Sequence, residues 1–183
     1  MSAFINLLTF SRIILAAAIF ILLMSPDGYF LALILFFIAG ITDYFDGYLA
    51  RKYNSTSQIG EILDPIADKI LIVFVLFGLA INLSSYLIGF VGSLILAREI
   101  WVGALRDFNA RNNKSDATKV TFLAKIKTTI QLFTLSVYLL ALTLNDMLLI
   151  QFAHIFLFIS LLITLYTGLV YTLNSVSDLD SKK

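Results

Sequence analysis

The stretch TDYFDGYLARKYNSTSQIGEILDPIADK, residues 42–69, carries four aspartates in a chain that is otherwise mostly apolar. They form two pairs, Asp43 with Asp46 and Asp64 with Asp68, whose members are three and four residues apart. On a helix these spacings put both members of a pair on one face. Burying carboxylates in an apolar environment is costly unless cations or hydrogen-bond donors accompany them.

Divalent cations with oxygen ligands are one explanation for carboxylates that face one another. Cysteine is absent and the only histidine, His154, lies far along the chain, so the donor set favours Mg²⁺ or Mn²⁺. Two such ions about 4 Å apart can clamp a phosphate during in-line displacement. Gly47 allows a ligand to approach the backbone closely, and Arg51 is suited to bidentate phosphate binding.

Two other interpretations of the same spacing stay open. The aspartates are also compatible with structural salt bridges to Arg51, Lys69 or Arg98, and with a proton or ion path in a carrier. Such a carrier would work without a nucleotide and would not need Gly47 or Arg51.

Composition places the site in a membrane. The 183 residues are 60% hydrophobic and 14% charged, with a net charge of +1, whereas soluble domains have about 25% charged residues. A transmembrane helix needs about 20 mostly apolar residues. Uncharged stretches occur at 13–26, 28–42, 70–97, 128–145 and 147–177, and at least the last three are long enough to span alone or nearly so. We therefore predict an all-α integral membrane protein with one transmembrane catalytic domain, residues 1–176, and a short polar cytoplasmic tail, 177–183.

Polar breaks divide the chain into about six expected transmembrane helices. Breaks at 25–28, 82–86 and 145–146 contain none of the thirteen Lys and Arg residues. Because basic residues favour the cytoplasmic side, both termini and the aspartate stretch are predicted to face the cytoplasm. The expected spans are about 4–24, 29–51, 62–82, 86–107, 121–144 and 148–174.

Helix rise places the charged residues at one depth. Counted from Asp27, Asp43 and Asp46 lie about 24 and 28 Å along their helix. Counted from Asn82, Asp68 and Asp64 lie about 21 and 27 Å along theirs. Lys127 and Arg106 fall about 28 and 31 Å from their own outer breaks. Acidic and basic side chains are therefore expected in a single layer at the cytoplasmic edge.

The full pattern resembles a known signature. It runs Asp43-x-x-Asp46-Gly47-x-x-Ala50-Arg51, eight residues, Gly60, three residues, Asp64, three residues and Asp68. This is similar to the signature of the CDP-alcohol phosphatidyltransferase family at every one of those positions. Four further segments resemble its phosphatidylglycerophosphate synthase branch: LLTFSRIILA (7–16), LDPIADKIL (63–71), REIWVGALRDF (98–108) and AKIKTTIQ (124–131).

The resemblance implies transfer of a phosphatidyl group from CDP-diacylglycerol to sn-glycerol 3-phosphate, with release of CMP, as a step of phospholipid biosynthesis. It implies two divalent cations on Asp43, Asp46, Asp64 and Asp68, with Asp68 also acting as the catalytic base. The CDP-diacylglycerol site would comprise Asp43, Asp46, Gly47, Ala50, Arg51 and Gly60. The resemblance also implies a bacterial-type inner membrane, contact with membrane lipids and a homodimer, and no nucleic-acid partner is expected.

The acceptor needs cations of its own. Arg106, Arg111, Lys125 and Lys127 are the candidates for binding its phosphate. This basic cluster favours a phosphate-bearing acceptor over serine, while phosphatidylglycerol and inositol phosphate remain alternative acceptors. For Thr9 and Arg12, headgroup contact, helix capping and snorkelling are all open. For Arg98, an ion pair with a neighbouring helix and a substrate role are both open.

Overall fold

The computed structural model describes residues 2–53, 58–112, 118 and 122–180 of the chain. All regular structure in this part is helical, as predicted, and it contains no strand. The elements are α1 (Ser2–Leu22), the short 3₁₀ helix η1 (Pro26–Gly28), α2 (Tyr29–Tyr53), α3 (Gln58–Asn82), α4 (Tyr86–Arg111), α5 (Phe122–Leu144) and α6 (Met147–Asp180).

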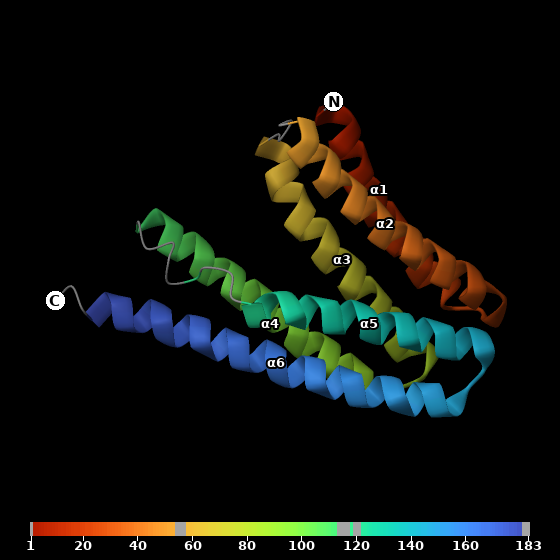
Figure 1. Cartoon of the computed structure of the whole chain (residues 1–183). Coiled ribbons are helices and arrows are strands. Elements are labelled where there is room, and N and C mark those ends of the chain that lie inside the picture. The colour runs from red at the N-terminus through yellow and green to blue at the C-terminus, as the bar shows by residue number, and fades with distance from the viewer. Residues whose placement is uncertain (1, 54–57, 113–117, 119–121, 181–183) are drawn as a thin grey trace.

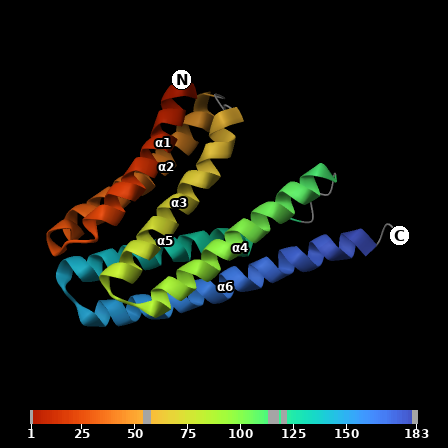
Figure 2. The same ribbon diagram turned by 180° about the vertical axis from the view of Figure 1, so that it is seen from behind.

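The six α-helices form two groups arranged as a V (Figure 1). In one group α1 packs against α2 and α3, and in the other α6 packs against α4 and α5. Contacts of α3 with α4 and α5, and of α2 with α5, join the groups. The groups meet at the end that carries the short turns and diverge toward the chain termini, which Figure 2 shows from behind.

The turns at the closed end are short because the backbone reverses within a few residues. Ser84 and Asn145 adopt left-handed conformations, with φ of 47° and 52°. The amide of Ser85 then donates to the carbonyl of Ala80 at 2.9 Å, and the amide of Asp146 makes the equivalent bond at 3.0 Å. Such bonds close a helix C-terminus in a Schellman motif. Both breaks that the sequence predicted here are confirmed.

The turn between α1 and α2 depends on a glycine. A Cβ atom at Gly28 would lie 2.3 Å from the carbonyl oxygen of Leu22, and this oxygen belongs to the backbone and cannot move aside. The side-chain amide of Asn82 adds a tie between helices, since it donates to the carbonyl of Leu23 at 2.7 Å and to the hydroxyl of Tyr29 at 2.6 Å. The closed end is therefore fixed by backbone sterics and by polar contacts.

A continuous apolar core fills the space between the helices. Its fully buried members include Ile19, Leu23, Val75, Leu79 and Ile88. The outward faces are also apolar, with Phe37, Phe90 and Phe158 each about half exposed or more. A surface this apolar suits contact with lipid, since soluble monomers rarely expose large contiguous apolar patches.

Length and composition qualify four described segments as membrane spans: Pro26–Phe45, Tyr86–Arg111, Phe122–Leu144 and Met147–Ser177. In α1 the apolar part, Asn6–Leu22, is shorter. In α3 the first half carries four charged side chains, which interrupts the apolar run. Six α-helices are present, as predicted, whereas four described segments qualify as spans. Helix α6 continues to Asp180, beyond its expected end near residue 174.

Candidate functional site

Arg12 of α1 lies at the centre of the acidic cluster, which we define as Asp43, Asp64 and Asp68. Its side chain is 0% exposed. Its Nη1 donates to Asp43 Oδ1 at 2.6 Å and to Asp68 Oδ1 at 2.5 Å. Its Nη2 donates to Asp64 Oδ1 at 3.2 Å. Aspartates from two different helices therefore converge on one guanidinium.

The packing of α1 explains this convergence. Helix α1 packs against both α2, which carries Asp43, and α3, which carries Asp64 and Asp68. Thr9 lies one turn before Arg12 on the same buried face, and its hydroxyl donates to Asp64 Oδ1 at 2.6 Å. Because both α1 side chains point inward, the snorkelling interpretation of Arg12 is wrong.

Charge in the cluster is not balanced by Arg12 alone. A guanidinium carries one positive charge that proteins do not remove, whereas Asp43, Asp64 and Asp68 each contribute a carboxylate. Their side chains remain 42–49% exposed, so water or another ligand can still reach them. The cluster is therefore suited to bind additional positive charge.

The donor chemistry fits a hard divalent cation. All donors are carboxylate oxygens, the ligands that Mg²⁺ and Mn²⁺ prefer. Within the described residues the carboxylates are spaced around the guanidinium, and no three His, Cys, Asp or Glu side chains lie close enough to hold one ion. The side chain of Asp46, the remaining predicted ligand, lies outside the described residues.

A cavity of about 430 Å³ lies beside the cluster, between α3, α4 and α5. This volume is in the range of small-molecule sites. Asp68 belongs to its wall as well as to the acidic cluster, so the two features are contiguous. The charged lining residues comprise two acids and four bases: Asp68, Glu99, Lys69, Arg98, Arg106 and Lys127.

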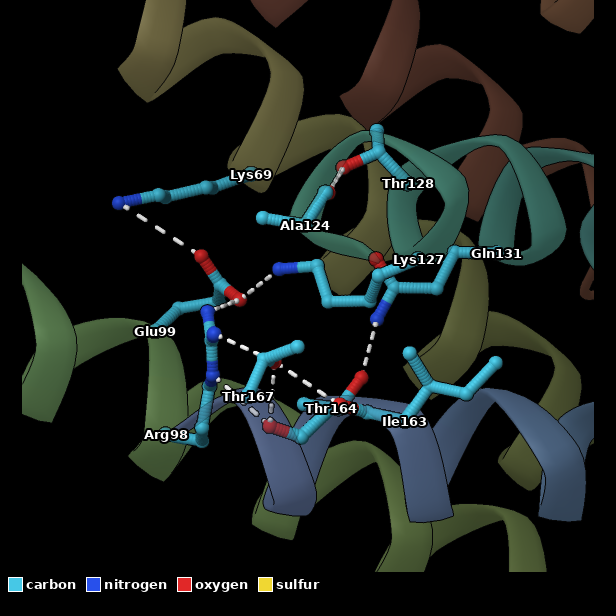
Figure 3. Close-up of polar contacts among 10 residues, drawn as sticks. All are labelled: Lys69, Arg98, Glu99, Ala124, Lys127, Thr128, Gln131, Ile163, Thr164 and Thr167. Carbon is cyan, nitrogen blue, oxygen red and sulfur yellow. Dashed lines mark hydrogen bonds and ion pairs between the residues drawn. The ribbon is translucent and has the colours of Figure 1, made fainter. Parts of the chain in front are cut away.

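Glu99 is at the centre of the basic side of the cavity (Figure 3). Its Oε1 accepts hydrogen bonds from Lys127 Nζ and, at 2.8 Å, from Arg98 Nη1. Its Oε2 lies 3.8 Å from Lys69 Nζ. Since the lysines belong to α5 and α3, this single carboxylate connects three helices across the cavity.

Arg98 is fixed independently by α6. Its Nε donates to the carbonyl of Thr164 at 3.0 Å, and its Nη2 donates to the Thr167 hydroxyl at 2.8 Å (Figure 3). Gly168 permits this close approach, because a Cβ atom there would lie 3.1 Å from Arg98 Cγ. Arg98 therefore combines an ion pair with Glu99 on its own helix and hydrogen bonds to α6.

Arg106 and Arg98 share an aromatic neighbour. Their guanidinium carbons lie 5.5 and 5.8 Å from the centroid of Tyr171, which is 1% exposed. These distances allow cation–π attraction. In the described part of the chain no acceptor meets the buried Nε of Arg106. Arg106 thus has a donor available to a ligand in the cavity.

The structure brings some predicted site residues together and leaves others undescribed. Of the acceptor candidates, Lys127 and Arg106 line the cavity, as their common depth suggested. Arg111 instead lies on the surface, 77% exposed, where it pairs with Asp107 at 2.8 Å. Gly60 is buried. The side chains of Asp46, Gly47, Ala50, Arg51 and Lys125 lie outside the described residues.

Sequence reasoning missed Glu99 and the contribution of α6. The adjacent charges Arg98 and Glu99 interrupt an apolar stretch, and such an interruption is a signal of function inside a membrane protein. No comparable signal marks Thr164 and Thr167, because threonines commonly bond their own helix backbone. The sequence also left the role of Arg12 open, and the structure gives it three aspartate partners.

The acidic cluster opens onto a cation-lined cavity, and the helices that form them include several that are long and apolar enough to cross a membrane. The family model described as CDP-alcohol phosphatidyltransferase matches residues 4–166. The chain belongs to the CDP-alcohol phosphatidyltransferase family, and it is a membrane protein.

Named relatives agree with this membership. The chain is similar to CDP-diacylglycerol--glycerol-3-phosphate 3-phosphatidyltransferase of Escherichia coli (strain K12), with 34% identity over 133 residues. These residues are 72% of this chain and 73% of the relative. The proteins of the same name from Shigella flexneri serotype 5b (strain 8401) and Shigella sonnei (strain Ss046) match with the same identity and coverage.

Proposed function

We propose that this protein transfers the phosphatidyl group of CDP-diacylglycerol to sn-glycerol 3-phosphate, giving phosphatidylglycerophosphate and CMP. Relatives whose names state this activity support the choice of reaction. The observation that carries the proposal is the position of Asp68. It joins the acidic cluster to the basic cavity, so a nucleotide phosphate and an acceptor can meet at one carboxylate.

The charge of the cavity supports a phosphate-bearing acceptor. Its four basic and two acidic lining residues give a surplus of two positive charges. A phosphate monoester carries about two negative charges at neutral pH. Lys127 and Arg106 supply the donors that bind this group, whereas serine, which has no phosphate, would leave the Nε of Arg106 without an acceptor. Lys125 remains an additional candidate.

In the proposed reaction Asp68 accepts the proton of the 1-hydroxyl of glycerol 3-phosphate. The hydroxyl oxygen forms a bond to the phosphorus of the phosphatidyl group, and the bond from that phosphorus to the oxygen bridging the two phosphates breaks. CMP leaves with the electron pair of that bond. Arg12 orients Asp68 through the contact at 2.5 Å, so it acts as a positioning residue.

Asp43, Asp46, Asp64 and Asp68 would hold two Mg²⁺ or Mn²⁺ ions. Such ions neutralise charge on phosphoryl oxygens and lower the pKa of a bound hydroxyl. Gly47, Ala50, Arg51 and Gly60 complete the proposed CDP-diacylglycerol site. Of these, Gly60 is buried on α3, one turn before Asp64, which fits a position of close packing.

We place the open end of the V at the cytoplasmic face of a bacterial-type inner membrane. The Lys and Arg distribution supports this orientation, because the three turns at the closed end contain no basic residue. All six helices would then cross the membrane and both termini would face the cytoplasm. A homodimer remains a prediction that crosslinking in native membranes can test.

An acceptor screen tests the function. Purified protein in detergent receives CDP-diacylglycerol and Mg²⁺ or Mn²⁺, and CMP release is followed with glycerol 3-phosphate, phosphatidylglycerol, inositol phosphate or serine. We expect release only with glycerol 3-phosphate, and its loss when a chelator is added. Release with another acceptor would assign a different substrate to the same site. No release with any acceptor, from folded protein, would reject the enzymatic proposal.

A further inference from the structure

We propose that Glu99 weakens anion binding at the acceptor site, by competing with the acceptor's phosphate for Lys127. This inference rests on the proposed function for the identity of the acceptor. It adds a residue whose carboxylate contacts the site's cations and whose neutralisation raises anion affinity.

The three cationic partners of Glu99 differ in whether they have other hydrogen-bond acceptors. Arg98 keeps two hydrogen bonds to α6, at 3.0 and 2.8 Å, whether or not Glu99 is present. Lys127 and Lys69 have no other acceptor within the described residues. Glu99 therefore controls the two lysines and leaves the position of Arg98 to α6.

The carboxylate of Glu99 lies where the phosphate of the acceptor would have to bind. Its side chain is 16% exposed and lies among three cations that line the cavity, Lys69, Arg98 and Lys127. An incoming phosphate must offer Lys127 more than a carboxylate does. A dianionic phosphate meets this condition because charge-assisted bonds strengthen with the charge of the acceptor. A monoanion exchanges one negative charge for another and gains little.

The same argument gives the direction of the effect when Glu99 is neutralised. In Glu99→Gln the surplus of positive charge in the cavity rises from two to three, and Lys127 becomes available without competition. We expect inorganic phosphate and sulfate to bind about tenfold more tightly or better, as removal of one nearby negative charge predicts.

The first test measures binding of inorganic phosphate and of sulfate to the full-length protein in detergent, by thermal shift, without added divalent cation. Asp107→Asn is the matched control, because it removes an acid from the same helix whose partner Arg111 is exposed and outside the cavity lining. Tighter phosphate binding in Glu99→Gln, with no change in Asp107→Asn, supports competition. Unchanged or weaker binding in folded Glu99→Gln overturns it, since Glu99 would then only position Lys127.

A second variant separates charge from folding. Glu99→Gln combined with Lys69→Gln restores a surplus of two positive charges, and its phosphate affinity should return to within about threefold of wild type. A phosphate affinity that stays high in the double variant overturns the charge argument. A phosphate affinity that is no higher than wild type in both the single and the double variant overturns it as well. If Glu99→Gln alone does not fold, Glu99→Asp takes its place. It keeps the negative charge, so its affinity for phosphate and for sulfate should stay within about threefold of wild type, and an increase of about tenfold is the contrary result.

The readout is independent of the proposed reaction. If wild-type protein releases no CMP with glycerol 3-phosphate while the phosphate affinities change as expected, the proposed function fails and the role of Glu99 stands. If CMP release occurs and the affinities do not change, the role of Glu99 fails alone.

Discussion

Arg12→Met tests whether one guanidinium holds the acidic cluster together. Methionine keeps an unbranched apolar side chain but removes the contacts to Asp43, Asp64 and Asp68, at 2.6, 3.2 and 2.5 Å. A hydrogen bond to a charged group contributes about 1.5–3 kcal/mol. The carboxylates are 42–49% exposed, so water replaces part of each contact. We therefore expect the free energy of unfolding to fall by about 3 kcal/mol.

The assay is reversible unfolding of the purified protein in mixed detergent and SDS, followed by circular dichroism. Arg111→Met is the control, because this arginine is 77% exposed and forms a surface pair with Asp107. Its loss should cost less than about 1 kcal/mol.

The effect of added Mg²⁺ on the stability of Arg12→Met is a second measurement on the same variant. Without Arg12 the carboxylates lose a cation that contacts all three of them, so added Mg²⁺ should stabilise Arg12→Met more than it stabilises wild type. The reasoning is refuted if Arg12→Met loses no more stability than Arg111→Met and responds to Mg²⁺ as wild type does.

Three further predictions follow from the same contacts. Asp68→Asn should reduce CMP release by about 10²–10⁴-fold while CDP-diacylglycerol still binds, and normal turnover would remove Asp68 from the role of base. Lys127→Met should raise the KM for glycerol 3-phosphate about tenfold with a smaller change in kcat, and an unchanged KM would place the acceptor phosphate elsewhere. Gly168→Ala should lower the free energy of unfolding by about 1–3 kcal/mol, because its Cβ would lie 3.1 Å from Arg98 Cγ. Gly103→Ala, with no described atom within 4 Å of its Cβ, should be neutral or stabilising, and equal effects of the two alanines would contradict the packing argument.

The helices and the common depth of the charged residues could be predicted from the sequence, because they depend on the length of apolar runs and on the constant rise of a helix. Helix rise is constant, so counting residues from each turn places Asp68, Lys127 and Arg106 at one level. The structure brings these three residues to one cavity. Turn positions were equally predictable, since Ser84 and Asn145 lie in polar breaks between long apolar runs.

Partners across helices were not predictable in the same way. Arg12 binds Asp43, 31 positions away, and Asp68, 56 positions away, and these contacts depend on how α1 is rotated against α2 and α3. The contacts of Arg98 with α6 depend on the small size of Gly168, which a sequence pattern does not distinguish from any other helical glycine. Which side chains pair across helices depends on how the helices pack, and this cannot be inferred from the pattern of a single sequence.

Because the two helix groups join only at one end, a change of the angle between them displaces residues more the farther they lie from that end. With 26 residues, α4 is about 39 Å long, so a rotation of about 5° at its turn with α3 moves its far end by about 3 Å. Residues near the turn, such as Ile88, hardly move, while Arg106, about 30 Å along the helix, moves about three quarters of that amount. A small change of angle thus alters the acceptor end of the site and leaves the apolar core intact. The position of the acceptor end of the site is therefore more sensitive to the angle between the helix groups than the position of the closed end is.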